Sequence, residues 1–66
     1  VGISAKITKA ATSSAVVKNA SGATIKIVRG TKSKTKVATS DSQSISVKGG
    51  SGTVKVYVNG VKVASK

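Results

Sequence analysis

The sequence predicts an all-β domain, a small antiparallel sandwich or barrel of about six or seven short strands. The large aliphatic residues are eleven Val and five Ile, with no Leu, Met, Phe or Trp, and β-branched side chains favour strands over helices. Apolar and polar residues alternate over short stretches, as they do when successive side chains point to opposite faces of a sheet. Asn-Gly and Gly-Gly pairs separate these stretches and are typical of turns.

The stretch TVKVYVNGVKVAS, residues 53–65, predicts a C-terminal β-hairpin. Its turn is Asn59-Gly60, which favours a two-residue type I′ turn because both residues tolerate positive φ. Strands are therefore expected over residues 53–58 and 61–64. The predicted register pairs Val56 with Val63. It places Val54, Val56, Val58, Val61 and Val63 on the buried face and Lys55, Tyr57 and Lys62 on the other.

The first third of the chain predicts one strand and a less regular segment. Residues 2–8 alternate Ile3, Ala5 and Ile7 with polar residues, so they are expected to form a strand. Residues 9–15 (KAATSSA) are small and polar, and we interpret them as a loop or an arm. Asn19 and Gly22 follow Val16–Lys18 and indicate a turn.

The middle of the chain predicts three more strands. Residues 23–29 alternate with Ile25 and Ile27 inward, and residues 43–48 do the same with Ile45 and Val47. Residues 31–39 alternate as well, with the lysines on one side and Ser33, Thr35 and Val37 on the other. Gly30, Ser40–Ser42 and the Gly-rich residues 49–52 read as the connections between them.

Residues 1–66 are enough for one small domain and no second core. The predicted core is thin, because it consists of Val, Ile and Ala, and the chain has no Cys with which to form a disulfide. Small domains in this position commonly depend on oligomerisation or on a partner surface. We therefore expect a homo-oligomer, or many copies within an assembly.

The charge and the missing residue types exclude most chemistry. The chain has eleven Lys, one Arg and a single acidic residue, Asp41, which gives a net charge of +11. It contains no His, Cys or Glu, so catalytic triads, paired carboxylates and most metal sites cannot be assembled within one chain. We predict no enzyme activity, no cofactor and no metal site. A charge this one-sided favours an anionic partner.

The candidate partner-binding residues are lysines and the single aromatic residue. Two readings of the lysine run in TKSKTK remain open: an electrostatic rail against an anionic partner, or an edge strand protected from aggregation. Tyr57 is a candidate interface anchor because Tyr is enriched at interface hot spots, although a surface Tyr within a solvated face is an equal alternative. The candidate set is Lys32, Lys34, Lys36, Lys55, Tyr57 and Lys62.

Three functions fit this inventory. The first, the main alternative, is nonspecific nucleic-acid binding through lysine. Sequence readers rely on Arg, Asn and Gln, and single-strand binders rely on several aromatics, whereas this chain has one Arg, one Gln, two Asn and one Tyr. The second is a structural protein that binds and stabilises a larger assembly through an acidic protein surface. The third, a cationic membrane-active peptide, is disfavoured because no amphipathic helix is evident. No transmembrane span or secretion signal is expected, and we expect no membrane partner.

The stretches NASGATIKIVRG and SISVKGGSGTVKVYVNGVKVAS, within residues 19–65, resemble in style the small β-rich accessory proteins of tailed-phage particles. These decoration or cement proteins bind the outside of a capsid. The resemblance implies a minor capsid protein located on the virion surface, with the major capsid protein lattice as its partner. It implies many copies per particle and no catalysis. It assigns no role to any single residue, and the one-sided lysine charge leaves contact with the genome open.

Overall fold

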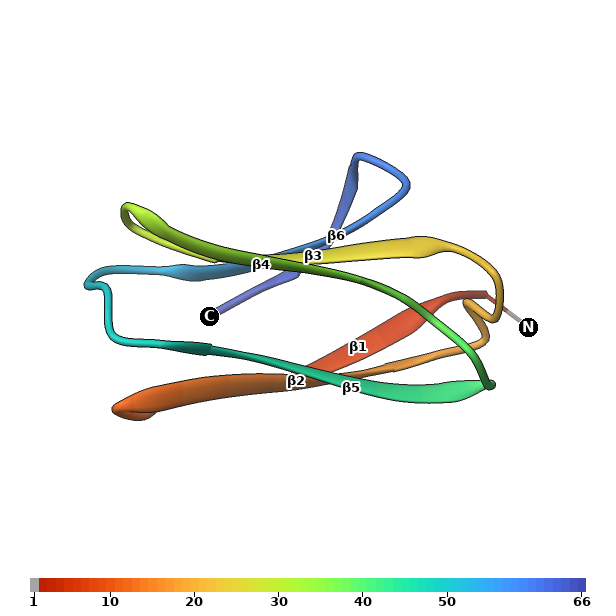
Figure 1. The fold of residues 1–66 in the computed structure, drawn as a ribbon, viewed down its shortest axis with the longest axis horizontal. Helices are drawn as coiled ribbons and strands as arrows, with labels where there is room; N and C mark the ends of the chain where they lie inside the picture. Colours follow the sequence, from red (N-terminus) through yellow and green to blue (C-terminus); the bar gives the residue numbers. More distant parts are fainter. Residues whose placement is uncertain (1) are drawn as a thin grey trace.

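The computed structural model describes residues 2–66, which form seven strands and no helix. The strands pack as two antiparallel sheets, one above the other in Figure 1. The all-β prediction is confirmed, and the fold is a sandwich because the sheets do not close into a barrel. The strands are β1 (Ser4–Thr8), β2 (Thr12–Lys18), β3 (Thr24–Arg29), β4 (Lys32–Val37), β5 (Ser42–Lys48), β6 (Val54–Val58) and β7 (Val61–Ser65).

The strand order is β1-β2-β5 in the three-stranded sheet and β4-β3-β6-β7 in the four-stranded sheet. The hairpins β1–β2, β3–β4 and β6–β7 stay within a sheet, whereas the other connections cross between the sheets. This connectivity resembles that of immunoglobulin-type sandwiches, in which strands A, B and E face C, F and G. Here β4 extends the second sheet beside β3. Residues 2–66 contain no helical segment that could span a membrane.

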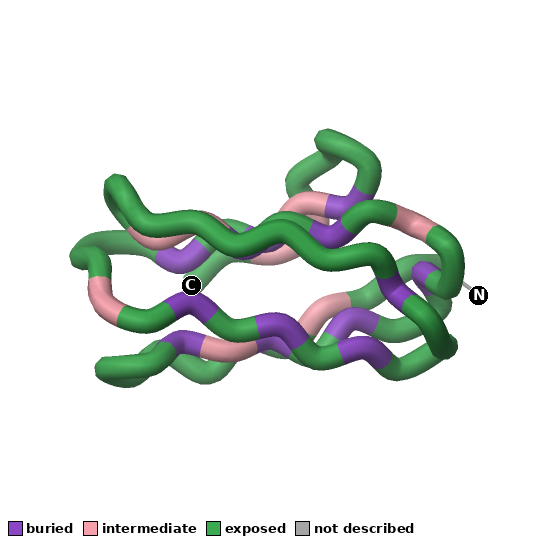
Figure 2. The backbone as a smooth tube through the Cα atoms, viewed as in Figure 1, coloured by how far each residue is buried: buried purple, intermediate pink, exposed green. Residues whose placement is uncertain are grey.

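The core is a single layer of aliphatic side chains between the sheets. Buried positions alternate with exposed ones along most strands (Figure 2), whereas β4 is exposed throughout and β7 has no buried residue. The predicted inward residues of β3 and β5 are buried, as is Gln43 at the start of β5. The apolar core consists of Ile7, Ala15, Val17, Ala20, Ile25, Ile27, Ala38, Ile45, Val47, Val54, Val56 and Val58.

The interpretation of residues 9–15 as a loop or an arm is wrong for most of that segment. Residues 12–15 are the first half of β2, the central strand of the three-stranded sheet. Their side chains are too small to give a hydrophobic signal, yet Ser13 and Ala15 face inward and are buried. Small inward residues are needed here because this end of the core also holds the side chain of Arg29.

The C-terminal hairpin is confirmed, with a correction to its register and burial. Asn59 and Gly60 both have positive φ, 50° and 83°, as a type I′ turn requires. A bulge in β7 shifts the pairing beyond the turn, so that Val56 pairs with Ala64 and not with Val63. The hairpin projects away from the three-stranded sheet (Figure 1), and this leaves Val61 65% exposed. The predicted burial of Val61 is therefore wrong, and Val63 is half-buried.

Arg29 closes the core at the end near the β1–β2 turn. It follows Ile27 on the inner face of β3, and its guanidinium reaches the opposite sheet. Nη1 donates hydrogen bonds to the Ala10 carbonyl oxygen at 2.7 Å and to Ser13 Oγ at 3.3 Å. Nε donates to the Gly52 carbonyl oxygen at 3.3 Å. One side chain therefore joins β3 to the β1–β2 turn and to the β5–β6 connection.

Gln43 closes the opposite end of the core. Its Oε1 accepts hydrogen bonds from the backbone N–H and the hydroxyl of Thr39, both at 3.2 Å. Its Nε2 donates to the Ser44 carbonyl oxygen at 3.0 Å. Among the described residues, no buried side-chain N or O atom lacks a partner. The polar groups at this end are therefore buried without an unpaired donor or acceptor.

The β3–β4 turn and the β5–β6 connection touch backbone to backbone, and glycine makes this contact possible. A Cβ on Gly30 would lie 2.7 Å from the Ser51 carbonyl oxygen, and a Cβ on Gly50 would collide with the Arg29 carbonyl. Both glycines also have positive φ, 61° and 76°. Any side chain at Gly50 therefore meets both a strained backbone and a rigid neighbour.

We predict that Gly50→Ala destabilises the fold more than Gly49→Ala. Gly49 has a similar φ of 79°, but a Cβ at this position would have no other atom within 4 Å. Positive φ should cost each variant about 1–2 kcal/mol. The collision with Arg29 should add about 1–3 kcal/mol for Gly50→Ala alone. Urea unfolding of both variants measures the difference, and equal losses would show that the turn and the connection do not touch as described.

Candidate functional site

The six predicted partner-binding residues lie on opposite faces of the four-stranded sheet. Lys55, Tyr57 and Lys62 are on its outer face, whereas the three lysines of β4 are on the inner side at the sheet edge. The six residues that were grouped as one candidate site therefore belong to two separate surfaces. We describe the outer one as the Tyr57 surface and the other as the β4–β5 groove.

The Tyr57 surface consists of Lys26, Lys55, Tyr57 and Lys62. Strand pairing places Lys26 directly beside Tyr57, and Tyr57 directly beside Lys62. Thr35 of β4 pairs with Lys26 on its other side, which extends the row across all four strands. Tyr57 is half-buried, whereas the three lysines of this surface are exposed. A shallow depression of about 390 Å³ on this face is lined by Thr24, Lys26, Val28, Thr35, Tyr57 and Gly60.

Lys26 belongs to this surface although the predicted set omitted it. The alternation in residues 23–29 already placed Lys26 outward. Its position next to Tyr57 depends on the pairing of β3 with β6, strands that are far apart in the sequence. No local pattern predicts that pairing.

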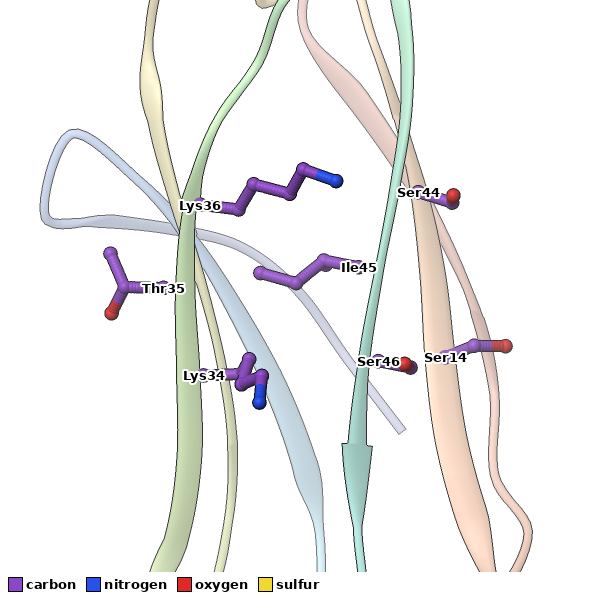
Figure 3. A pocket seen from close by; sticks show the side chains of 7 residues that line it. All are labelled: Ser14, Lys34, Thr35, Lys36, Ser44, Ile45 and Ser46. Atoms are coloured by element: carbon purple, nitrogen blue, oxygen red, sulfur yellow. The ribbon is translucent and has the colours of Figure 1, made fainter.

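The β4–β5 groove opens between the edges of the two sheets. Lys34 and Lys36 pair with Ile27 and Ile25, whose side chains are in the core, so these lysines also lie on the inner side. Figure 3 shows both lysines reaching from β4 toward β5, with Ile45 reaching back and Thr35 pointing away. The groove measures about 420 Å³ and is lined by Ser14, Lys34, Thr35, Lys36, Ser44, Ile45 and Ser46.

Lysine is well suited to this inner edge position. Its aliphatic stem can lie along apolar surface near Ile45 while the ammonium group stays in water. An inward-pointing charge at a sheet edge also discourages the addition of a further strand from a like-charged chain. The edge-protection reading of the lysine run is thus consistent with the geometry. The other interpretation, contact with an anionic partner, involves the same ammonium groups.

Neither surface contains a His, Cys or Glu side chain, because the chain has none of these residues. Among residues 2–66 there is no cluster of three His, Cys, Asp or Glu side chains that could hold a metal ion. The single acidic residue, Asp41, lies in the connection between β4 and β5 and outside both sets of lysines. The lysines of both surfaces therefore have no carboxylate side chain of their own chain beside them. The charge of both surfaces is therefore positive, with no acidic side chain to offset it.

Comparisons with protein-family models, with curated protein sequences and with solved structures find no match to this chain. The immunoglobulin-type connectivity therefore stands on the strand order alone. A sandwich of this kind serves many unrelated functions, so it indicates no activity.

We predict that the inner lysines of β4 keep the chain from associating with itself. The double variant Lys34→Thr/Lys36→Thr should self-associate at concentrations where the parent chain does not, because its sheet edge loses two of its three charges and gains β-branched residues. Sedimentation velocity measures this. The control, Lys26→Thr/Lys55→Thr, loses the same charge from the outer face and should not associate. Association of both variants alike would assign the effect to net charge rather than to the edge.

Proposed function

We propose that this chain is a non-enzymatic structural protein that attaches to an acidic protein surface of a larger assembly. The Tyr57 surface makes the attachment. The specific candidate is a viral capsid decoration protein, bound in many copies to the lattice of a major capsid protein on the virion surface.

The observation that supports this proposal is the composition of the Tyr57 surface. A half-buried Tyr stands among three lysines on an open sheet face, and that face has no acidic side chain. Tyrosine at the centre of a patch is a common anchor of protein interfaces. The surrounding lysines complement an acidic partner and favour fast encounter with it. The shallow depression suits contact with another surface better than enclosure of a small ligand.

The engagement of Arg29 within the fold favours a protein partner over nucleic acid. Base readout relies on Arg, and single-strand binding relies on several stacked aromatics. The chain has one Arg and one aromatic residue. The Arg29 guanidinium is already engaged with the Ala10 and Gly52 carbonyl oxygens, at 2.7 and 3.3 Å. Only nonspecific phosphate contact by lysine remains for a nucleic acid.

We predict that Tyr57→Ala detaches the chain from its native particles. Its side chain is the only aromatic on the face, so its loss should weaken attachment at least about tenfold, as loss of a hot-spot residue does. Lys26→Ser/Lys55→Ser/Lys62→Ser should also weaken it. Particles from cells that produce the chain are sedimented through a density gradient, and the bound chain is quantified by mass spectrometry.

The matched control is Lys6→Ser/Lys9→Ser/Lys18→Ser, which removes the same charge from exposed positions of β1, β2 and their turn, outside both lysine surfaces, and should leave attachment unchanged. Nuclease treatment should not release the parent chain. Release by nuclease would instead support the nucleic-acid alternative. A chain that sediments with no particle at all would contradict attachment to an assembly.

A further inference from the structure

The outer edge of β4 offers unpaired backbone groups. The two-residue turn Gly30-Thr31 makes Arg29 and Lys32 the closing pair of the β3–β4 hairpin, and in such hairpins the closing pair is hydrogen-bonded. Antiparallel pairs alternate between bonded and non-bonded, so the N–H and C=O groups of Ser33, Thr35 and Val37 point away from β3. The hydrogen bond from Ala38 N–H to the Ala23 carbonyl oxygen, 2.9 Å, fits this alternation.

The two sides of this edge differ in chemistry. The inner side presents Lys32, Lys34 and Lys36 at every second position, and the outer side presents Ser33, Thr35 and Val37. All six residues are exposed. An added strand would therefore place alternate side chains directly opposite ammonium groups and the others opposite small or β-branched residues. Opposite charges in such cross-strand pairs stabilise, and like charges destabilise.

We propose that β4 binds an extended acidic segment of a partner protein as an additional strand. The segment carries carboxylates at three alternate positions, which meet Lys32, Lys34 and Lys36 above the β4–β5 groove. Small or β-branched residues stand between the carboxylates. This site is separate from the Tyr57 surface, and the inference does not rest on the function proposed above.

Charge complementarity selects this occupant over the others. A second copy pairing through β4 would bring lysines opposite lysines, which the net charge of +11 makes worse. A nucleic acid could meet the ammonium groups, but its backbone cannot continue the N–H to C=O ladder of a sheet. The acidic strand satisfies both the charges and the edge, which is the recognition mode called β-augmentation.

The groove leaves room for the acidic side chains. Lys34 and Lys36 point into the groove rather than into the packed core, and Ile45 lines the groove from the β5 side (Figure 3). Carboxylates entering the groove stay near water, so they form ion pairs without the large desolvation cost of full burial. The contact of Ile45 with the carboxylate side-chain stems adds apolar area.

The test uses a nine-residue peptide of alternating Glu and Thr, titrated into the ¹⁵N-labelled chain. Hydrogen exchange at the Ser33 and Thr35 amides should slow by about tenfold or more at saturation, because these amides gain a partner. The Lys34 amide, already directed toward β3, should change little. A peptide of the same composition with its Glu residues contiguous should bind more weakly and protect neither amide.

Two sets of variants separate strand addition from general attraction. Lys34→Ser/Lys36→Ser should weaken peptide binding about tenfold, from two lost cross-strand pairs, whereas Lys26→Ser/Lys55→Ser should weaken it about twofold or less. Thr35→Pro removes one of the N–H groups directed to the free edge, a position at which an edge strand tolerates proline. The peptide should then no longer protect the Ser33 amide from exchange. The ¹H–¹⁵N spectrum of each variant confirms that it is folded.

Equal binding of the two peptides without amide protection would overturn the proposal, as would equal weakening by the two lysine pairs. If a short DNA duplex displaces the peptide and leaves both amides in fast exchange, the duplex binds through charge alone. The amide protection seen with the peptide is then specific to strand addition, as proposed. Failure of the peptide to bind would overturn strand addition and leave attachment through the Tyr57 surface unaffected, because that attachment is measured on native particles.

Discussion

The fold depends on one constraint: the apolar core of residues 2–66 is built only from Val, Ile and Ala, and these side chains form a single layer. The molecule is accordingly slender, with extents of 31 × 17 × 17 Å. Each strand can bury one face at most, so every polar side chain of a strand must point outward or sit at an end or an edge. The two surfaces described above follow from this. The outer face of the four-stranded sheet receives the outward residues of all four strands, and the edge strand β4 carries lysines along its inner side.

A layer this thin cannot close its own ends, and polar side chains do so instead. Arg29 closes one end and Gln43 the other, each through backbone groups and a hydroxyl rather than through an opposite charge. Removal of Arg29 would leave the Ala10 and Gly52 carbonyls without these donors, so its role is bound to the fold. This engagement also explains why the positive charge offered to partners comes from lysine alone.

Local patterns predicted the strands because alternation acts within five to seven residues, and Asn59-Gly60 predicted its turn because few residues tolerate two successive positive φ values. The strand at residues 12–15 was not predicted because its inward side chains are Ser13 and Ala15, which give no hydrophobic contrast. The run at Lys32 to Lys36 showed its alternation but not its orientation, since neither side is apolar enough to identify the core. Val61 was misplaced because its burial depends on how far the hairpin extends past the opposite sheet. The position of Lys26 beside Tyr57 required long-range pairing between β3 and β6.

The two surfaces are linked through Thr35. Its side chain ends the outer row that runs through Lys26, Tyr57 and Lys62, and its backbone faces the free edge where an added strand would pair. A strand bound to β4 would continue the four-stranded sheet, so its outward side chains would lengthen the same row. One partner covering the outer face could thus contact a strand supplied by a second partner on β4. In a lattice of repeated subunits this arrangement would join two neighbours through one small domain. Two such contacts held at fixed separation bind far more tightly than either alone, which suits a chain whose individual contacts are few.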